Sequence, residues 1–290
     1  MNYTRACLIA SFLLFLTCKT IFFVEKLPAP VLENFRPPLN KIQGHCVASL
    51  LSGNYPKYSH YAFKLGRSIQ RVIEIDMILL IDRNQPVTEE QGLALSKTGW
   101  TLRPADHILA QQDARSVLYT KLQAWTLVEY ESVLFLDLDT LVIGDIAPFF
   151  TYWLPKLNLE GKALASVQDR PNSFNPWWSS NYENRVFNSG VMLLKPSLDT
   201  FFYLVNGLAL MQYKSFGLGD QDYLNAALGA SRMDLPFELN AMTHVAHIET
   251  QAWKVIAREP KILHFTWPKP EDWLCDELET ENMCEMWRRF

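Results

Sequence analysis

Two aspartates separated by one residue are the pair in this sequence best suited to hold a metal ion. Residues 133–136 are wholly apolar, and Asp137 and Asp139 follow them directly. In an extended chain, residues i and i+2 point to the same side, so both carboxylates would meet at the tip of a strand. Carboxylates this close repel each other unless a positive charge lies between them. Mg²⁺ and Mn²⁺ supply that charge, binding one or two carboxylates together with substrate phosphates.

Other polar residues lie at the ends of apolar or helical patterns, where a sheet edge would gather them. They are Lys121, Asp169, Asn188, Ser189, Gly190, Asp220, Gln221 and His264. Each also has an ordinary explanation. Asp220 suits a helix N-cap, and a histidine after an apolar strand is commonly a hydrogen-bonded core residue. They are candidate site residues because they occur together with the aspartate pair.

Apolar runs that alternate with helical spacing predict the elements that carry these residues. The predicted strands are 46–51, 75–81, 133–136, 191–194 and 262–265, and the predicted helices follow Pro56 and cover 117–125, 198–211 and 220–228. This alternation predicts an α/β fold with a mostly parallel sheet covered by helices on both faces. Ligands of such sheets bind beyond the carboxyl ends of the strands.

The composition is that of an ordinary globular protein. The chain has 290 residues, 49% of them hydrophobic and 20% charged, with a formal net charge of -4. Binders of duplex nucleic acid usually carry a basic footprint, so the charge argues against that class of partner. An acidic protein that handles phosphates needs local positive charge, which a bound cation would supply.

The N-terminal residues 1–25 are interpreted as a membrane anchor or a signal segment. The apolar run 7–16 follows Arg5, and a second run resumes after Lys19. This stretch barely reaches the ~20 residues of a spanning helix, and it also fits a cleavable signal. Both alternatives predict the secretory route. Residues 26–44 contain four prolines and are interpreted as an extended tether, which leaves 45–290 as the folded domain.

The five cysteines do not indicate a zinc site, because they form no CxxC pair. Cys275 and Cys284 lie close in the sequence. They would pair in an oxidising compartment and stay free in the cytosol, and the sequence leaves both states open.

Taken in order, the motifs resemble glycosyltransferase family eight, which includes glycogenin, galactinol synthase and plant xylan glucuronosyltransferases. The matching motifs are Thr-Lys-Leu-x-x-Trp at Lys121, Asp-x-Asp-Thr-Leu at Asp137, Phe-Asn-Ser-Gly-Val at Phe187, Gly-Asp-Gln at Gly219, and His-Phe at His264 with Lys-Pro at Lys269. They cover roughly residues 45–273. The resemblance implies a GT-A-type, Rossmann-like fold, a UDP-sugar donor, and Mn²⁺ or Mg²⁺ as cofactor.

The resemblance also implies roles for individual residues. Asp137, Asp139 and His264 would bind the metal, and Lys121, Asp220 and Gln221 would be the catalytic residues. Lys269 would steady the leaving phosphate, although the stretch from His264 to Lys269 is shorter than in the family. The residues implied in donor binding are Ser52, Asn54, Tyr58, Lys121, Asp137, Leu138, Asp139, Asp169, Asn188, Ser189, Gly190, His264 and Lys269.

The activity implied by the resemblance is transfer of a hexosyl or uronosyl group, with retention, to a carbohydrate or glycoconjugate acceptor. Asp220 or Gln221 would shield the oxocarbenium-like centre or act as nucleophile, and front-face attack without an enzyme nucleophile is equally open. The expected location is the Golgi lumen, behind a single-pass type II anchor, or outside the cell after signal cleavage. Self-glucosylation is not supported, because no counterpart of glycogenin's tyrosine region is found.

Two other functions compete with this one. A haloacid-dehalogenase-like phosphatase also places Asp-x-Asp after an apolar strand, but its pair normally opens the domain and its later acidic motif fits Gly219-Asp220 poorly. A family-eight fold kept as a non-catalytic binding protein is the second alternative, suggested by the short stretch after His264.

Overall fold

The computed structural model describes residues 41–52, 56–109, 116–169, 186–210, 219–248, 253–254, 259–266, 269 and 281–290. All of them belong to one compact unit, Leu39–Phe290. The N-terminal segment 1–25, together with Asn54 and Cys275, lies outside the described residues. Among the helices of the described part, none has both the length and the apolar character needed to cross a bilayer.

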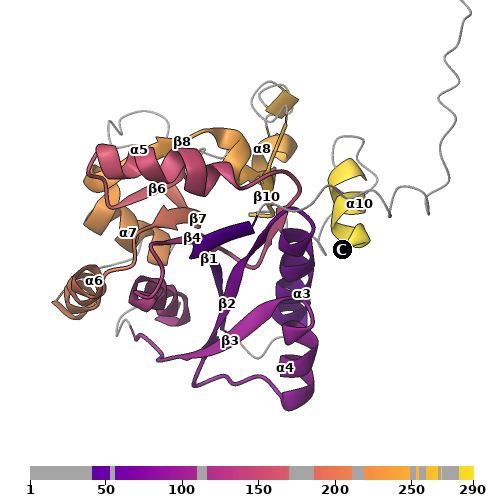
Figure 1. Cartoon of the computed structure of the whole chain (residues 1–290), viewed down its shortest axis with the longest axis horizontal. Helices are drawn as coiled ribbons and strands as arrows, with labels where there is room; N and C mark the ends of the chain where they lie inside the picture. The colour runs from indigo at the N-terminus through magenta and orange to yellow at the C-terminus, as the bar shows by residue number, and fades with distance from the viewer. Residues whose placement is uncertain are drawn as a thin grey trace, which may run out of the picture. The chain divides into compact units, whose positions relative to one another are not determined.

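Strands and helices alternate along the chain, as expected for an α/β protein (Figure 1). The strands are β1 (Lys41–Leu51), β2 (Glu74–Asp82), β3 (Trp100–Ala105), β4 (Ser132–Leu136), β5 (Thr140–Val142), β6 (Leu164–Gln168), β7 (Phe187–Leu194), β8 (Arg232–Leu235), β9 (Ala241–Met242) and β10 (Ile262–His264). The helices are α3 (Pro56–Gln70), α4 (Glu89–Ser96), η1 (Ser116–Thr126), η2 (Phe149–Trp153), α5 (Leu154–Leu159), α6 (Leu198–Leu210), α7 (Asp220–Leu228), η4 (Gly229–Ser231), η5 (Phe237–Asn240), α8 (Thr243–Ile248) and α10 (Glu281–Arg289).

A seven-stranded sheet forms the centre, with the order β3-β2-β1-β4-β7-β6-β8. Neighbours are parallel except at β7, which runs antiparallel to both β4 and β6. The prediction of a mostly parallel sheet is therefore confirmed. A second sheet of three short strands, β5-β10-β9, adds the late strand that carries His264.

Helices cover both faces of the central sheet, because successive strand residues point to opposite sides. Val47 of β1 packs in the core cluster that includes Leu65 of α3, whereas Cys46 and Ala48 pack in the cluster that includes Trp125 of η1. Figure 1 shows α3 and α4 side by side along β2 and β3, and their packing contacts agree.

The antiparallel direction of β7 brings distant polar residues to one sheet edge. Leu136, the last residue of β4, pairs with Val191 in β7. The residues that precede Val191 therefore lie beside those that follow Leu136, and the Asp137 N–H donates to the Gly190 carbonyl at 2.7 Å. The predicted strand 191–194 begins earlier than expected, at Phe187. The Asn-Ser-Gly motif is thus part of a buried strand rather than a turn before it.

Two other elements differ from the sequence prediction. The first strand begins at Lys41, inside the segment interpreted as a tether. It is irregular there, since Gly44 adopts φ +79° and the register with β2 shifts between Lys41 and Cys46. The helix that carries Lys121 is a 3₁₀ helix, η1. Three of its buried side chains, Tyr119, Leu122 and Trp125, recur every third residue, which is the period of that helix.

The C-terminal helix α10 packs against α3 and the end of β10. The Trp287 ring meets Tyr61 edge-on at 5.0 Å and Phe265 at 4.9 Å between centroids. The buried ammonium of Lys64 donates to the Trp287 carbonyl at 2.6 Å. Cys284, on the same helix, is disulfide-bonded. Helix α10 therefore supports the strand that ends at His264.

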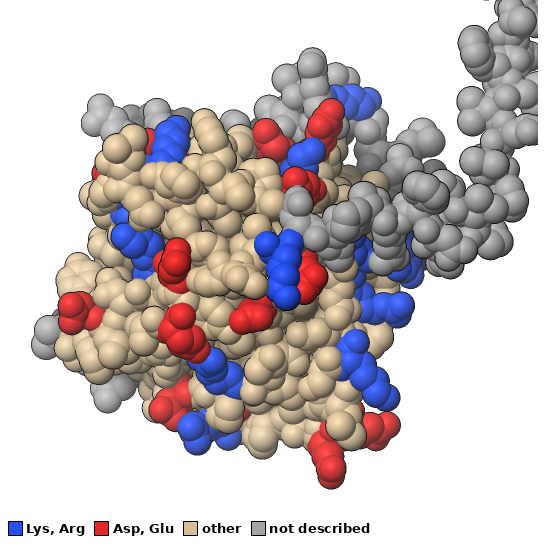
Figure 2. Space-filling view, viewed as in Figure 1, with Lys and Arg blue, Asp and Glu red and all other residues tan. Residues whose placement is uncertain are grey.

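Acidic and basic side chains are interspersed on the face of the molecule drawn in Figure 2. That face carries both signs of charge, in keeping with the formal net charge of -4.

Close packing of α3 on β3 predicts that Gly66→Ala destabilises the fold. A Cβ at position 66 would lie 2.6 Å from Trp100 Nε1 and 2.8 Å from the Thr98 carbonyl. Overpacking costs about 1–3 kcal/mol, which exceeds the gain of about 1 kcal/mol from replacing glycine in a helix. We expect the free energy of unfolding in urea to fall by up to about 2 kcal/mol.

Gly229→Ala is the matched control, since its added Cβ would meet nothing within 4 Å. It should leave the free energy of unfolding unchanged or raise it by up to about 1 kcal/mol. Equal effects of both substitutions would contradict the packing described for α3.

Candidate metal and donor site

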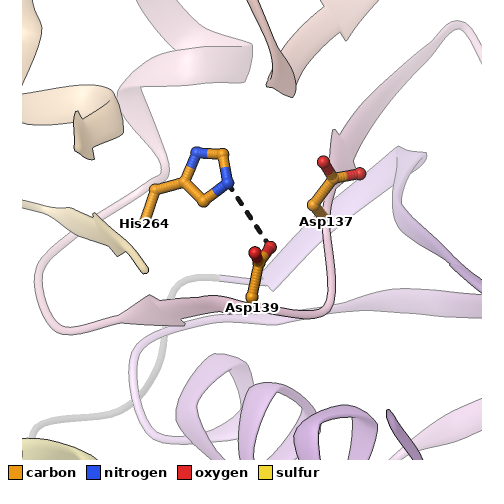
Figure 3. A group of neighbouring side chains, drawn as sticks. All are labelled: Asp137, Asp139 and His264. Carbon is orange, nitrogen blue, oxygen red and sulfur yellow. Dashed lines mark ion pairs between the residues drawn. The ribbon is translucent and has the colours of Figure 1, made fainter. Parts of the chain in front are cut away.

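Asp137, Asp139 and His264 converge on one point at the edge of the two sheets (Figure 3). One ligand atom from each residue lies within 4.8 Å of the others, and His264 Nε2 is 3.4 Å from Asp139 Oδ1. The register explains the convergence, because β5 pairs antiparallel with β10 so that Thr140 faces His264. The sequence prediction of these three residues as one cluster agrees with the geometry.

The two aspartates converge through a turn rather than along an extended strand. β4 ends at Leu136, and residues 138–139 form a turn before β5. The Thr140 N–H and hydroxyl both donate to the Asp137 carbonyl, at 3.1 and 2.7 Å. The two carboxylates are thus brought together by a turn that the hydrogen bonds of Thr140 close, and not by the i and i+2 spacing of a strand.

Asp139 carries a negative charge that its neighbours stabilise. Burial by itself would raise the pKa of this carboxyl, but Lys269 and His264 hold it well below its usual range. Lys269 donates to Asp139 Oδ2 and, at 3.2 Å, to the Phe265 carbonyl. Burial would lower the pKa of Lys269, but the Asp139 carboxylate raises it above its usual value. The C-terminal lysine predicted to contact a phosphate therefore does reach the metal cluster.

Lys121 lies between the metal cluster and the start of α7. Its ammonium is 3.0 Å from Asp137 Oδ1 and 2.7 Å from Asp220 Oδ2. Burial would lower the pKa of Lys121, yet the two carboxylates raise it above its usual value, so the side chain stays charged. The sequence-predicted Lys121 and Asp220 are therefore one buried ion pair. Asp220 is the first residue of α7, and Gly219 occupies the N-cap position considered for it.

A second set of hydrogen bonds joins β7, α7 and Asp169. The Ser189 hydroxyl donates to Asp220 Oδ2 at 2.9 Å, and the Ser189 N–H donates to Gln221 Oε1 at 3.1 Å. Gln221 Nε2 in turn donates to Asp169 Oδ2 at 2.6 Å. Asn188 and Gly190 belong to a third set that leads to His264. The residues predicted to bind the sugar donor or act on it, which follow β6, lie in β7 and begin α7, are therefore brought together.

Of the residues predicted for the nucleoside, Ser52 follows β1 and Tyr58 lies in the first turn of α3. The Ser52 hydroxyl donates to Asp82 Oδ2 at 2.9 Å. Leu138 packs its side chain into the core, which leaves only its backbone for a ligand. Asn54 lies outside the described residues.

Sequence reasoning missed a buried acid at this same edge. Asp82 ends β2, and its carboxylate pairs with His107 Nδ1 at 2.6 Å. Burial would raise the pKa of Asp82, but hydrogen bonds from His107, the Asn84 N–H and Ser52 hold it below its usual value. The signal was available, since Asp82 follows an apolar run as Asp137 does.

The cluster fits a hard divalent cation. Two carboxylates and one imidazole are ligands that Mg²⁺ and Mn²⁺ accept, with phosphate oxygens or water completing the shell. Asp139 Oδ1 and His264 Nε2 lie 3.4 Å apart, so one ion could contact both atoms. Lys121 pairs with Asp137, and Lys269 pairs with Asp139.

Comparison with known proteins places the chain in a family. The sequence profile described as "Glycosyl transferase family 8" matches residues 44–273, well over half of the chain. The chain belongs to glycosyltransferase family 8. This match confirms the resemblance drawn from the motifs. It gives no support to the phosphatase considered as an alternative.

Curated relatives of this family-8 chain match over part of their length. A putative UDP-glucuronate:xylan alpha-glucuronosyltransferase 4 of Arabidopsis thaliana is 30% identical over 169 residues, which is 57% of this chain and 26% of the plant protein. Glycogenin-1 of Homo sapiens is 31% identical over 162 residues, 54% of this chain and 40% of glycogenin. The matched region is thus less than half of either relative.

Solved glycosyltransferase structures share the fold. The galactosyltransferase LgtC, solved with donor and acceptor sugar analogues, superposes with a TM-score of 0.54 at 18% identity, covering 84% of this chain and 96% of LgtC. GlyE of Streptococcus pneumoniae gives 0.58 at 20% identity, with coverage of 84% and 60%. The family-8 chain therefore has the GT-A-type fold predicted for it.

The position of Lys121 between two carboxylates predicts how Lys121→Met responds to metal. Removing the ammonium leaves Asp220 buried without a counter-charge, which costs about 3–5 kcal/mol. Asp137 and Asp220 would then repel each other, and a divalent cation bound at Asp137 would relieve part of that repulsion. Mn²⁺ should therefore raise the melting temperature of Lys121→Met by more than it raises that of the wild-type protein.

Lys41→Met serves as the control, since Lys41 pairs with Glu74 at the surface with about 60% of each side chain exposed. Its stability should change by less than about 1 kcal/mol and its response to Mn²⁺ not at all. If Mn²⁺ raised the melting temperatures of the wild type and of Lys121→Met equally, Lys121 would not be neutralising the carboxylates at the proposed metal site.

Proposed function

We propose that this chain is a metal-dependent, retaining glycosyltransferase that transfers a hexosyl or uronosyl group from a UDP-sugar to a carbohydrate or glycoconjugate acceptor. The observation that carries the proposal is the cluster of Asp137, Asp139 and His264, with one ligand atom of each within 4.8 Å of the others. Lys121 and Lys269 flank this cluster on two sides. Membership of family 8 supplies the reaction class.

The charges of the cluster suit departure of a nucleoside diphosphate. Asp137, Asp139 and His264 would hold Mn²⁺ or Mg²⁺, which when bound supplies a Lewis acid for the diphosphate. Lys121 and Lys269 are buried or half-buried ammonium groups, so their charge is weakly screened by water. Each would move from its aspartate to phosphate oxygens when the donor binds. The lysines then stabilise the negative charge that develops on the leaving group.

The hydrogen bonds of Asp220 and Gln221 favour positioning roles for these two residues over covalent attack. Gln221 uses its oxygen on the Ser189 N–H and its amide nitrogen on Asp169. Asp220 Oδ2 accepts from both Lys121 and Ser189. Gln221 thus orients Asp169, the carboxylate proposed to bind hydroxyls of the donor sugar. Retention by front-face attack requires no enzyme nucleophile and agrees with these contacts.

The donor is proposed from the names of the relatives. The plant relatives are described as acting with UDP-glucuronate on xylan, and LgtC is described as a galactosyltransferase. UDP-glucuronate and UDP-galactose are therefore the donors to test first, and UDP-glucose is added as a third hexosyl donor. The proposed acceptor is a carbohydrate or a glycoconjugate.

We also propose that residues 1–25 direct the protein into the secretory pathway, as a type II anchor in the Golgi or as a cleaved signal. A glycosylation acceptor tag fused after Phe290 should be modified in the lumen when the full chain is expressed in animal cells. Deleting residues 1–25 should leave the tag unmodified. A tag that stays unmodified on the full chain would overturn this assignment.

The central test of the activity is release of UDP in the presence of Mn²⁺. We expect UDP release from at least one of the three donors, and loss of that release on adding a chelator. Asp139→Asn removes a metal ligand and should lower turnover at least about 100-fold while the far-ultraviolet circular dichroism stays unchanged.

Asp106→Asn is the control, since Asp106 is a surface carboxylate paired with Arg83 and 78% exposed. It should keep wild-type turnover. Near-normal turnover by Asp139→Asn would refute the metal assignment. Absence of UDP release and of thermal protection by every donor would favour a non-catalytic binding protein instead.

A further inference from the structure

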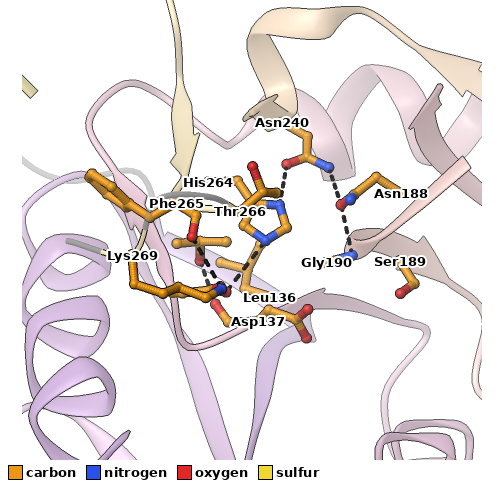
Figure 4. Close-up of polar contacts among 12 residues, drawn as sticks. Leu136, Asp137, Asn188, Ser189, Gly190, Asn240, His264, Phe265, Thr266 and Lys269 are labelled. Carbon is orange, nitrogen blue, oxygen red and sulfur yellow. Dashed lines mark hydrogen bonds and ion pairs between the residues drawn. The ribbon is translucent and has the colours of Figure 1, made fainter. Parts of the chain in front are cut away.

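Asn240 connects the proposed metal ligand His264 to the backbone of β7. Asn240 is the last residue of η5 and is fully buried. Its Oδ1 lies 2.9 Å from His264 Nδ1, and its Nδ2 lies 2.9 Å from Asn188 Oδ1. The same Asn188 oxygen accepts from the Gly190 N–H at 3.0 Å. Figure 4 shows these three contacts as one chain that ends at the imidazole.

The backbone N–H at one end determines the direction of every hydrogen bond in this chain. The Gly190 N–H is only a donor, so the Asn188 atom that faces it must be the carbonyl oxygen. That oxygen needs a donor from Asn240, so the Asn240 amide nitrogen faces it and the Asn240 oxygen faces His264. An oxygen beside Nδ1 requires a proton on Nδ1. The remaining nitrogen, Nε2, then keeps its lone pair.

We propose that Asn240, oriented by Asn188 and the Gly190 amide, is a positioning residue that holds His264 in the Nδ1–H tautomer with Nε2 ready to bind the metal. Nε2 is the nitrogen that points at Asp139, at 3.4 Å. In the neutral ring without metal, Asp139 would favour a proton on Nε2, which is the tautomer that cannot bind metal. The Asn240 contact opposes this preference. A second hydrogen bond of this kind is how proteins commonly set the tautomer of a histidine ligand.

Packing around the ring holds the imidazole in the same orientation. A Cβ at Gly190 would lie 2.1 Å from His264 Cε1, so the glycine leaves just enough space for the ring. The Gly190 carbonyl accepts from the Asp137 N–H, which ties the opposite side of the metal cluster to the same residue. Gly190 therefore contacts His264 directly, anchors Asp137 and begins the hydrogen-bond chain through Asn188.

The tautomer can be measured without metal, donor or turnover. Long-range proton–nitrogen NMR spectra of the full chain, labelled with ¹⁵N in its six histidine rings, distinguish a protonated Nδ1 from a protonated Nε2. His264→Asn assigns the signal. At about pH 8.5, where an ordinary imidazole is neutral, we expect Nδ1 of His264 to carry the proton. A proton on Nε2 in the wild-type protein would overturn the proposal at once.

Two variants distinguish the hydrogen-bond chain from simple packing. Asn240→Leu keeps most of the volume and removes the acceptor, so the proton should move to Nε2, where Asp139 accepts it. Asn188→Asp still presents an oxygen to Gly190 and Asn240, so the tautomer should stay Nδ1–H. Thr243→Val is the control, because the Thr243 hydroxyl donates to the His264 carbonyl at 3.1 Å, a bond to the backbone and not to the ring. It should leave the tautomer unchanged.

The functional consequence is the affinity for Mn²⁺ alone. It is measured from the decrease in the electron paramagnetic resonance signal of free Mn²⁺ as the ion binds. Asn240→Leu should weaken Mn²⁺ binding about 10- to 100-fold, and Asn188→Asp should hold it within about threefold. An unchanged tautomer and unchanged Mn²⁺ affinity in a folded Asn240→Leu variant would overturn the proposal.

The role of Asn240 in metal binding rests on the proposed metal site, whereas the hydrogen bonds that fix the tautomer do not. If Mn²⁺ binds but no donor releases UDP, the proposed function fails and the role of Asn240 stands. If Nδ1 is unprotonated while UDP release depends on metal, the role of Asn240 fails and the proposed function stands.

Discussion

The electrostatic repulsion among Asp137, Asp139 and Asp220 is the constraint on which the site depends. Three carboxylates lie close together. Asp220 is buried, and Asp137 and Asp139 are partly buried, so their like charges repel more strongly than they would in water. Lys121 bridges Asp137 and Asp220, while Lys269 and His264 hold Asp139. Lysine ammonium groups from separate parts of the chain thus keep the acids together, and a bound cation and phosphates would replace part of these contacts.

The direction of one strand decides which residues can take part. β7 runs antiparallel between β4 and β6, so its first residues lie beside the carboxyl end of β4. Asn188, Ser189 and Gly190 each engage a different partner there: Asn240, α7 and Asp137. A parallel β7 would have placed these residues at the opposite edge of the sheet. The site therefore follows from topology as much as from the motif residues themselves.

The residues that sequence reasoning identified are those with a local signal. An apolar run followed by a polar residue marked Asp137, Asp139 and His264, because buried strands and their ends are visible in the pattern. Asn240 and His107 have no such signal, since each acts only through a partner more than twenty residues away. The direction of β7 was also beyond a single sequence, because an apolar run does not record which neighbour it pairs with.

The most direct measurement is the position of manganese in a crystal of the full chain grown with Mn²⁺ and UDP. Anomalous diffraction at the manganese edge locates the ion independently of any assumption about the site. The account predicts one strong peak bound by Asp137, Asp139 and His264 Nε2, with Lys121 and Lys269 on the diphosphate. A peak elsewhere, or UDP bound while both lysines remain on their aspartates, would contradict it.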